Sequence, residues 1–325
     1  MKKTLILLIA FALLGSFTTW YVLSKPDDKT TLLAEERRFK VENTDEIYKI
    51  FIADRRGNQT TLERKDGYWL YNGKYPARPN AVENVLDAVR RIEIQYKPPT
   101  AAVNNIIKNL STQGIKIQTF NRNNQLLQAY YIGGGTADET GTYAIKEGAE
   151  QPYVVSIPGW QGNIRFRFNL IGDDWRDKTV FAEKAENIES VSVEYPKNRN
   201  KSFKLERAGN TYRITPFYDI TPIINRPYKE GSVERYLEGF RNLGAEAFEN
   251  ENPRRDSVRQ LLPFGIITLK NKAGAEKTVR LFPIFTANNQ AERYFIDVNN
   301  EDFMLGQHLV LSKILWGYDF FFENP

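Results

Sequence analysis

Acidic and aromatic side chains lie next to one another at Asp173, Asp174 and Trp175, a combination that could act on a glycan. Glycoside hydrolysis requires two carboxyl groups that straddle the scissile bond. The same acids could instead cap a turn and pair with Arg176. We favour this structural role because paired acids are common, whereas the geometry of catalysis is restrictive. A glycan hydrolase stays open as the alternative function, and the carboxylates it would draw on are Asp138, Glu139, Asp173 and Asp174.

Patterns that could bind a cofactor or a metal are weak. The run Gly133-Gly134-Gly135 resembles a phosphate-binding loop, but such a loop requires a Lys-Ser or Lys-Thr pair that opens a helix. The run is therefore predicted to be a hairpin loop. His308 is the only histidine and there is no cysteine, which excludes thiol catalysis, disulfides and histidine-rich metal sites. His308 is expected to be partly buried and hydrogen-bonded. The sequence predicts no catalytic residue, no metal site and no cofactor.

Tryptophans offer another kind of chemistry, the stacking of a ligand on an exposed ring. The candidates are Trp69, Trp160, Trp175 and Trp316. Such residues are more often part of a core, because exposed large aromatic rings are the minority. Trp160, Trp175 and the adjacent Arg176 are kept as candidate partner-binding residues.

An apolar segment between Tyr212 and Pro227 is the most distinctive candidate for a partner contact. Pro216 and Pro222 restrict its backbone, and its apolar residues are Phe217, Tyr218, Ile220, Ile223 and Ile224. Loops often carry function, whereas large apolar side chains favour burial. Two interpretations stay open: an edge that contacts a partner, or a wedge that folds between two modules.

This segment stands out because the second half of the chain repeats the first. From Val82 to Ile145, a shift of 151 residues lands on matching residues without a gap. Upstream, Leu62-Glu63-Arg64 recurs as Leu205-Glu206-Arg207 at a shift of 143. The difference, 151 − 143, gives about eight extra residues in the second copy. A repeat of this kind indicates two related structural modules.

Each copy has the pattern of a helix pair followed by strands. Asn80 could cap a helix that runs to Ile92, with Glu83 in the position of a capping box, and the counterpart helix opens at Ser232. Shorter helices are predicted over 101–110 and 255–262. Strands are predicted over 115–120, 127–132, 142–145 and 153–157, and short connections favour antiparallel pairing. The predicted fold class is α+β, with two tandem related modules, each a twisted antiparallel sheet covered by a helix pair.

The N-terminal segment has the pattern of a membrane anchor. Lys2 and Lys3 precede an uncharged run of 20 residues, 4–23, which would span roughly 30 Å as a helix, the thickness of a bilayer core. A single transmembrane helix is favoured over a cleaved signal peptide, because no clear A-x-A site follows. The two lysines favour a cytoplasmic N-terminus, which places the bulk of the chain outside the cytoplasm.

Length and charge complete the organisation. The 325 residues suit two domains, and we expect an anchor (1–24), a stalk (25–44), a first α+β module (45–181) and a second one (182–325). The net charge of +5 is small, and basic residues are interspersed with acidic ones. Nucleic acid is therefore not expected as a partner.

Several segments together are similar to a known bacterial family. They are Phe39-Lys40-Val41, the run 47–52, Leu62-Glu63-Arg64, Gly67-Tyr68-Trp69, Tyr75-Pro76, the helix 80–92, Gly141-Thr142-Tyr143 and Trp175-Arg176-Asp177-Lys178. With the N-terminal anchor, they resemble the bacterial envelope family named domain of unknown function 4340. The resemblance implies a membrane-anchored extracytoplasmic component, of a kind often encoded near subunits of ABC-type export or gliding-associated transporters. It carries over no catalytic residue.

The sequence as a whole predicts a non-enzymatic binding or scaffold protein on the outer side of a bacterial cytoplasmic membrane. Its expected partners are the membrane, through a single N-terminal span, and an envelope protein such as an ABC-type transporter subunit. The alternatives are an envelope glycan hydrolase with paired carboxylates and a purely structural spacer.

Overall fold

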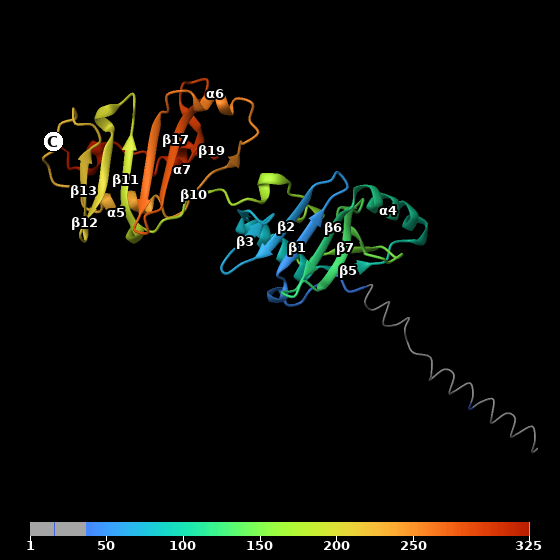
Figure 1. The fold of residues 1–325 in the computed structure, drawn as a ribbon. Helices are drawn as coiled ribbons and strands as arrows, with labels where there is room; N and C mark the ends of the chain where they lie inside the picture. The colour runs from blue at the N-terminus through green and yellow to red at the C-terminus, as the bar shows by residue number, and fades with distance from the viewer. Residues whose placement is uncertain (1–15, 17–36, 325) are drawn as a thin grey trace, which may run out of the picture. The chain divides into compact units, whose positions relative to one another are not determined.

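The computed structural model describes residue 16 and residues 37–324, and the chain divides into two compact units between Trp175 and Arg176 (Figure 1). Residues 176–181, which the sequence assigned to the first module, belong to the second unit. There β10 (Thr179–Phe181) pairs with β14 (Leu243–Gly244). The predicted anchor lies outside the described residues, apart from residue 16. No helix among the described residues is both long and apolar enough to cross a membrane.

The first unit is built on a nine-stranded sheet in which neighbouring strands run antiparallel. Its strands are β1 (Lys49–Ala53), β2 (Gln59–Arg64), β3 (Trp69–Tyr71), β4 (Tyr75–Pro76), β5 (Glu93–Tyr96), β6 (Ile115–Phe120), β7 (Leu126–Gly135), β8 (Thr142–Lys146) and β9 (Tyr153–Ser156). Their order is β4-β3-β2-β1-β6-β7-β8-β9-β5. Side chains alternate between buried and half-buried along β1 and β6, as expected where one face of a sheet lies on the core.

Two helices complete the first unit, α3 (Pro79–Arg91) and α4 (Thr100–Gln113). The apolar face of α3 lies in the same core as the inward residues of the sheet, and its buried residues are Ala81, Val82, Val85, Ala88 and Val89. The predicted N-cap at Asn80 is wrong. Pro79 occupies the first turn and Arg78 is the capping residue, because the fixed φ of proline suits the start of a helix.

Part of the predicted stalk belongs to this core. Phe39 is 2% exposed and makes edge contacts with the rings of Tyr130 and Tyr153. The backbone N–H of Val41 donates to the carbonyl of Val89 at 3.1 Å. Residues 39–41 therefore anchor the start of the first unit on α3 and the sheet.

The run Gly133-Gly134-Gly135 is the end of strand β7, so the predicted hairpin loop was wrong. Gly135 pairs with Thr142 of β8, and the turn consists of the residues between them. Close packing explains why position 133 is a glycine, since a Cβ there would lie 2.9 Å from Cδ2 of Leu110 on α4. Glycine in a strand often marks such a close approach.

The second unit repeats the sheet of the first with one strand fewer. Its strands are β11 (Ile188–Glu194), β12 (Phe203–Ala208), β13 (Thr211–Pro216), β15 (Ala247–Phe248), β16 (Gly265–Asn271), β17 (Glu276–Phe285), β18 (Ala291–Val298) and β19 (Asp302–Gln307). Their order is β13-β12-β11-β16-β17-β18-β19-β15. This is the order of the first sheet without a counterpart of β4, and it is the clearest structural trace of the repeat.

The helix pair predicted for the second unit is reduced to short segments. They are α5 (Ser232–Glu238), α6 (Arg255–Arg259) and α7 (His308–Leu311). The helix α5 ends at Glu238, and at the next residue, Gly239, a Cβ would meet the side chain of Ile314 and the carbonyl oxygen of Lys313, at 3.0 and 3.1 Å. Leu243, which corresponds to Ile92 at the shift of 151 residues, lies in β14. The helix α6 contains no buried residue.

Candidate partner-binding site

The apolar segment of the second unit follows β13, the edge strand of its sheet (Figure 1). We call residues 217–226 the insertion loop. It has no counterpart in the first unit, where β3 is followed after a short turn by β4. Loops at an edge are the usual position for residues that bind partners.

Aromatic residues hold the base of the insertion loop against the sheet. The N–H of Phe217 donates to the carbonyl of Ser202 at 3.1 Å, and the rings of Phe217 and Tyr218 meet edge to face at 5.0 Å. The hydroxyl of Tyr218 donates to the Glu194 carboxylate, and this hydrogen bond raises the pKa of Tyr218. The base of the loop therefore has a defined conformation.

The returning part of the loop is fixed as well. The N–H of Ile224 donates to the hydroxyl of Tyr318 at 3.2 Å, and Ile224 packs against the core of the second unit. The guanidinium of Arg226 donates to the carbonyl of Glu323 at 2.6 Å. Both ends of the loop are thus held by hydrogen bonds, and the returning end also packs on the core at Ile224.

The tip of the loop presents two isoleucines to solvent. Ile220 is 75% exposed and Ile223 is 76% exposed, while Thr221 between them is 8% exposed and its N–H donates to the carbonyl of Tyr218 at 3.0 Å. Covering one such side chain with a partner would contribute about 1–2 kcal/mol, because full burial is worth roughly 1.5–3 kcal/mol. These two isoleucines make the tip a candidate protein contact, since exposed apolar surface marks such sites when it forms a patch.

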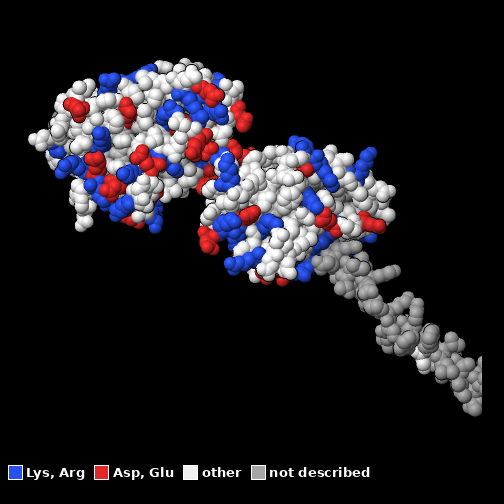
Figure 2. All heavy atoms as spheres, in the orientation of Figure 1, with Lys and Arg blue, Asp and Glu red and all other residues white. Residues whose placement is uncertain are grey.

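Cations lie beside the base of the loop. The guanidinium of Arg199 lies 5.2 Å from the ring centre of Tyr218, and the Lys204 amine lies 5.2 Å from that of Phe217. On the face of the molecule seen in Figure 2, basic and acidic residues are interspersed. The candidate site therefore combines an apolar loop tip with positively charged side chains beside Phe217 and Tyr218.

Trp160 lies apart from the insertion loop, in the first unit. Its ring is 42% exposed and packs against Phe166, with ring centres 5.5 Å apart. The guanidinium of Arg167 lies 5.2 Å from the ring centre of Trp160 and forms an ion pair with Asp87 at 2.7 Å. Phe166 and Arg167 were missed in the sequence, although the alternation of basic and aromatic residues at 165–168 was a usable signal.

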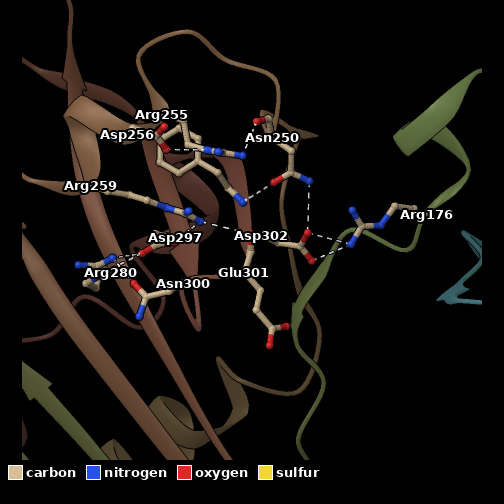
Figure 3. A network of polar contacts seen from close by, with 11 residues as sticks. Arg176, Asn250, Arg255, Asp256, Arg259, Arg280, Asp297, Asn300, Glu301 and Asp302 are labelled. Carbon is tan, nitrogen blue, oxygen red and sulfur yellow. Dashed lines mark hydrogen bonds and ion pairs between the residues drawn. The ribbon is translucent and has the colours of Figure 1, made fainter.

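Trp175 and Arg176 are interior residues, which contradicts their selection as exposed candidates. Trp175 has no exposed surface, and its indole N–H donates to the carbonyl of Leu170 at 2.8 Å. Arg176 is 6% exposed and binds both carboxylate oxygens of Asp302, at 2.7 and 2.9 Å (Figure 3). A ring without exposed surface cannot stack on a ligand.

Asp302 starts a network that attaches the segment before α6 to the sheet (Figure 3). Asn250 donates to Asp302 at 3.2 Å and accepts the N–H of Phe303 at 2.8 Å. The guanidinium of Arg255 donates to the carbonyl of Asn250 at 2.8 Å. These contacts are internal to the second unit, and we assign them a structural role.

A second part of the network surrounds Asp297 of β18 (Figure 3). This residue is 1% exposed and lies between two guanidinium groups, with 2.7 Å to Arg259 and 2.9 Å to Nε of Arg280. The sequence contained a signal that was missed, since Asp297 is the one acid in the run 294–298 of β18. A buried carboxylate requires such partners.

The carboxylates considered for catalysis lie in two separate turns: Asp138 and Glu139 between β7 and β8, and Asp173 and Asp174 in the 3-10 turn Gly172–Trp175. Asp138 accepts hydrogen bonds from the hydroxyl of Thr136 at 2.5 Å and from the N–H of Thr140, and these bonds lower its pKa. Glu139 lies in the left-handed region of the same turn. Asp177 accepts the N–H and hydroxyl of Thr179, as a turn cap does. A lowered pKa is opposite to what a catalytic acid needs.

His308 is exposed rather than partly buried. Its ring stacks on Tyr294 and its Nδ1 lies 3.1 Å from the Tyr294 hydroxyl, so the predicted hydrogen-bond partner is present. Within residues 37–324, no group of three or more His, Asp or Glu side chains is arranged to hold a metal ion.

Comparison with known proteins gives one match. The family model described as Domain of unknown function (DUF4340) matches residues 33–261, a range that includes the insertion loop and ends just after α6. No curated protein and no solved structure matches the chain.

Proposed function

The chain belongs to the DUF4340 family, a domain of unknown function, and we propose that it is a membrane-anchored extracytoplasmic binding or scaffold protein. In this proposal the insertion loop contacts an envelope protein, such as a subunit of an ABC-type transporter or of a gliding-associated assembly. The observation that carries the proposal is the exposure of Ile220 and Ile223 on a loop held at both ends.

The uncharged segment 4–23 supports the membrane part of the proposal, because its length suits a bilayer span. A tethered protein needs only modest affinity for a partner in the same membrane, since the tether raises the effective concentration. A small apolar contact of two isoleucines with basic neighbours is consistent with such an interaction.

Site-specific photocrosslinking in the native membrane tests the proposal. A photoreactive amino acid is placed at position 220, and a control at position 309, where Leu309 is 78% exposed in the same unit. We expect position 220 to crosslink to one envelope protein at least five times more strongly than position 309. Equal crosslinking at both positions, or none at 220, would contradict the assignment of the loop.

A further inference from the structure

The outer side of β13 has backbone groups available for another strand. Alternate residues of an antiparallel strand direct both backbone groups to the same neighbour. Phe217 donates its N–H to Ser202 on the β12 side, so the residues that point away from β12 are Tyr212, Ile214 and Pro216. The N–H of Ile214 confirms this direction, because it donates to the hydroxyl of Tyr228 at 3.1 Å.

In the first unit, the equivalent edge is covered by the chain itself. The strand β4 pairs with β3, so that Pro76 lies opposite Leu70 and Tyr75 opposite Tyr71. The N–H of Ala77 then donates to the carbonyl of Trp69 at 2.7 Å. Trp69 is the residue that corresponds to Tyr212 in the repeat.

In the second unit, the insertion loop carries the corresponding segment away from the edge. Pro227 and Tyr228 correspond to Pro76 and Ala77, but Tyr228 forms a bridge with Phe322 near the C-terminus. Tyr228 therefore reaches β13 only through its hydroxyl. Among the described residues, no backbone N–H donates to the carbonyl of Tyr212.

A cavity of about 470 Å³ lies beside the start of β13, where its lining includes Tyr212 and Tyr228. It is open to solvent, and Val233 and Leu237 of α5 contribute to its apolar lining. Its polar lining includes Lys229 and three carboxylates, those of Glu186, Glu230 and Glu234. Arg207 also lines the cavity, where it donates to the carbonyls of Ala185 and Ile188, and with Lys229 it leaves the three carboxylates an excess of one negative charge. The groove therefore favours a basic occupant.

We propose that this groove binds an extended peptide segment of a partner protein, which adds as a strand to the edge of β13. Its backbone donates to the carbonyl of Tyr212 the hydrogen bond that Ala77 donates to Trp69 in the first unit, and a basic side chain meets the carboxylates of Glu230 and Glu234. Strand addition at an exposed edge is a common mode of peptide recognition. The inference rests on the proposed binding function and adds a second contact surface to it.

The chain itself provides the probe. A fluorescent peptide of residues 73–79, Gly-Lys-Tyr-Pro-Ala-Arg-Pro, contains the strand that covers the equivalent edge, with basic residues at both ends of its core. Its binding to the full-length protein in detergent is measured by fluorescence anisotropy. We expect saturable binding that is at least five-fold weaker in the double variant Glu230→Lys/Glu234→Lys. A control, Glu276→Lys/Glu292→Lys, changes the same charge at exposed positions outside the groove and should bind normally.

The outcomes distinguish this inference from the function of the insertion loop. The variant Ile220→Asp/Ile223→Asp should bind the peptide as the unmodified protein does, even where its crosslinks to an envelope partner are lost. Absence of saturable peptide binding, or equal weakening by both double lysine variants, would overturn the proposal. A concentration-dependent dimer that is lost in Glu230→Lys/Glu234→Lys would also overturn it, in favour of a second copy of the chain as occupant.

Discussion

Arg207 has the same position and contacts in the second unit as Arg64 has in the first. Arg64 lies 4.8 Å from the ring centre of Trp69 and donates to the carbonyls of Thr44 and Ile47 at 2.8 Å. Arg207 lies 4.6 Å from the ring centre of Tyr212 and donates to carbonyls at the equivalent turn before β11. The repeated Leu-Glu-Arg motif is therefore explained by structure: its arginine attaches the start of each sheet to its edge.

Replacement of this arginine should destabilise its unit. In Arg207→Ala the carbonyls of Ala185 and Ile188 lose a charged donor, and we expect a loss of about 1–3 kcal/mol in the free energy of unfolding. Urea denaturation followed by tryptophan fluorescence measures the change. The exposed Arg213→Ala on β13 is the matched control, and an equal effect of both variants would argue against a structural role for Arg207.

The ion pair between Arg167 and Asp87 should make stability depend on pH in acid. Burial alone would raise the pKa of Asp87, but hydrogen bonds and charge from Arg167 and Arg91 lower it below the ordinary value of 3.8. The contribution is thus present above pH 3.8 and is lost as the pH falls through the lower pKa of the folded state. We expect Asp87→Asn to reduce the melting temperature at pH 7 but to have little effect once the pH is well below 3.8. A similar reduction at both pH values would contradict this explanation, and Asp66→Asn at an exposed turn is the control.

The glycines at the end of β7 should tolerate a methyl group unequally. Gly133→Ala places a Cβ 2.9 Å from the side chain of Leu110, and we expect a loss of about 1–3 kcal/mol from overpacking. Gly134→Ala is the control, since no atom lies within 4 Å of its added Cβ. Thermal unfolding of the two variants, measured by circular dichroism, compares them directly. Equal melting temperatures would show that α4 does not pack against β7 as described.

The buried carboxylate of Asp297 should contribute more to the free energy of unfolding than an exposed carboxylate does. Asp297→Ala leaves Arg259 and Arg280 without their shared partner, which typically costs about 3–5 kcal/mol. Asp256, whose side chain is 77% exposed beside Arg255, provides the control variant Asp256→Ala, for which less than about 1 kcal/mol is expected. Chemical denaturation of both variants measures the two losses in the free energy of unfolding. A loss at Asp297 as small as that at Asp256 would show that the network does not stabilise the second unit.

Much of the fold was predictable where a local pattern matched the structure that formed. The alternation over 115–120 predicted β6 to the residue, and the apolar steps after Asn80 predicted the buried face of α3. The repeat predicted two related sheets, because matched apolar positions fix the same pairing. It did not predict the early end of α5, after which Leu243 pairs with Phe181 of β10, a residue far away in the sequence.

The candidate site was only partly predictable for the same reason. Pro216 and Pro222 marked the insertion loop, but exposure of its isoleucines depends on the anchoring of Tyr218 and Ile224 by Glu194 and Tyr318. The partner of Arg176 is Asp302, which is 126 residues away in sequence, so no local pattern could indicate it. The open edge of β13 required the comparison of hydrogen bonds between two folded units.

The most direct test of the central claim is the amount of envelope partner that co-purifies with the insertion-loop variant from native membranes. Tagged Ile220→Asp/Ile223→Asp is compared with the unmodified protein and with Leu309→Asp, at equal expression and unchanged melting temperature. We predict that the unmodified protein and Leu309→Asp recover a transporter or assembly subunit at a fixed stoichiometry, and that the loop variant recovers less than one fifth of it. Recovery of the same amount by all three proteins would contradict the assignment of the insertion loop as the partner contact.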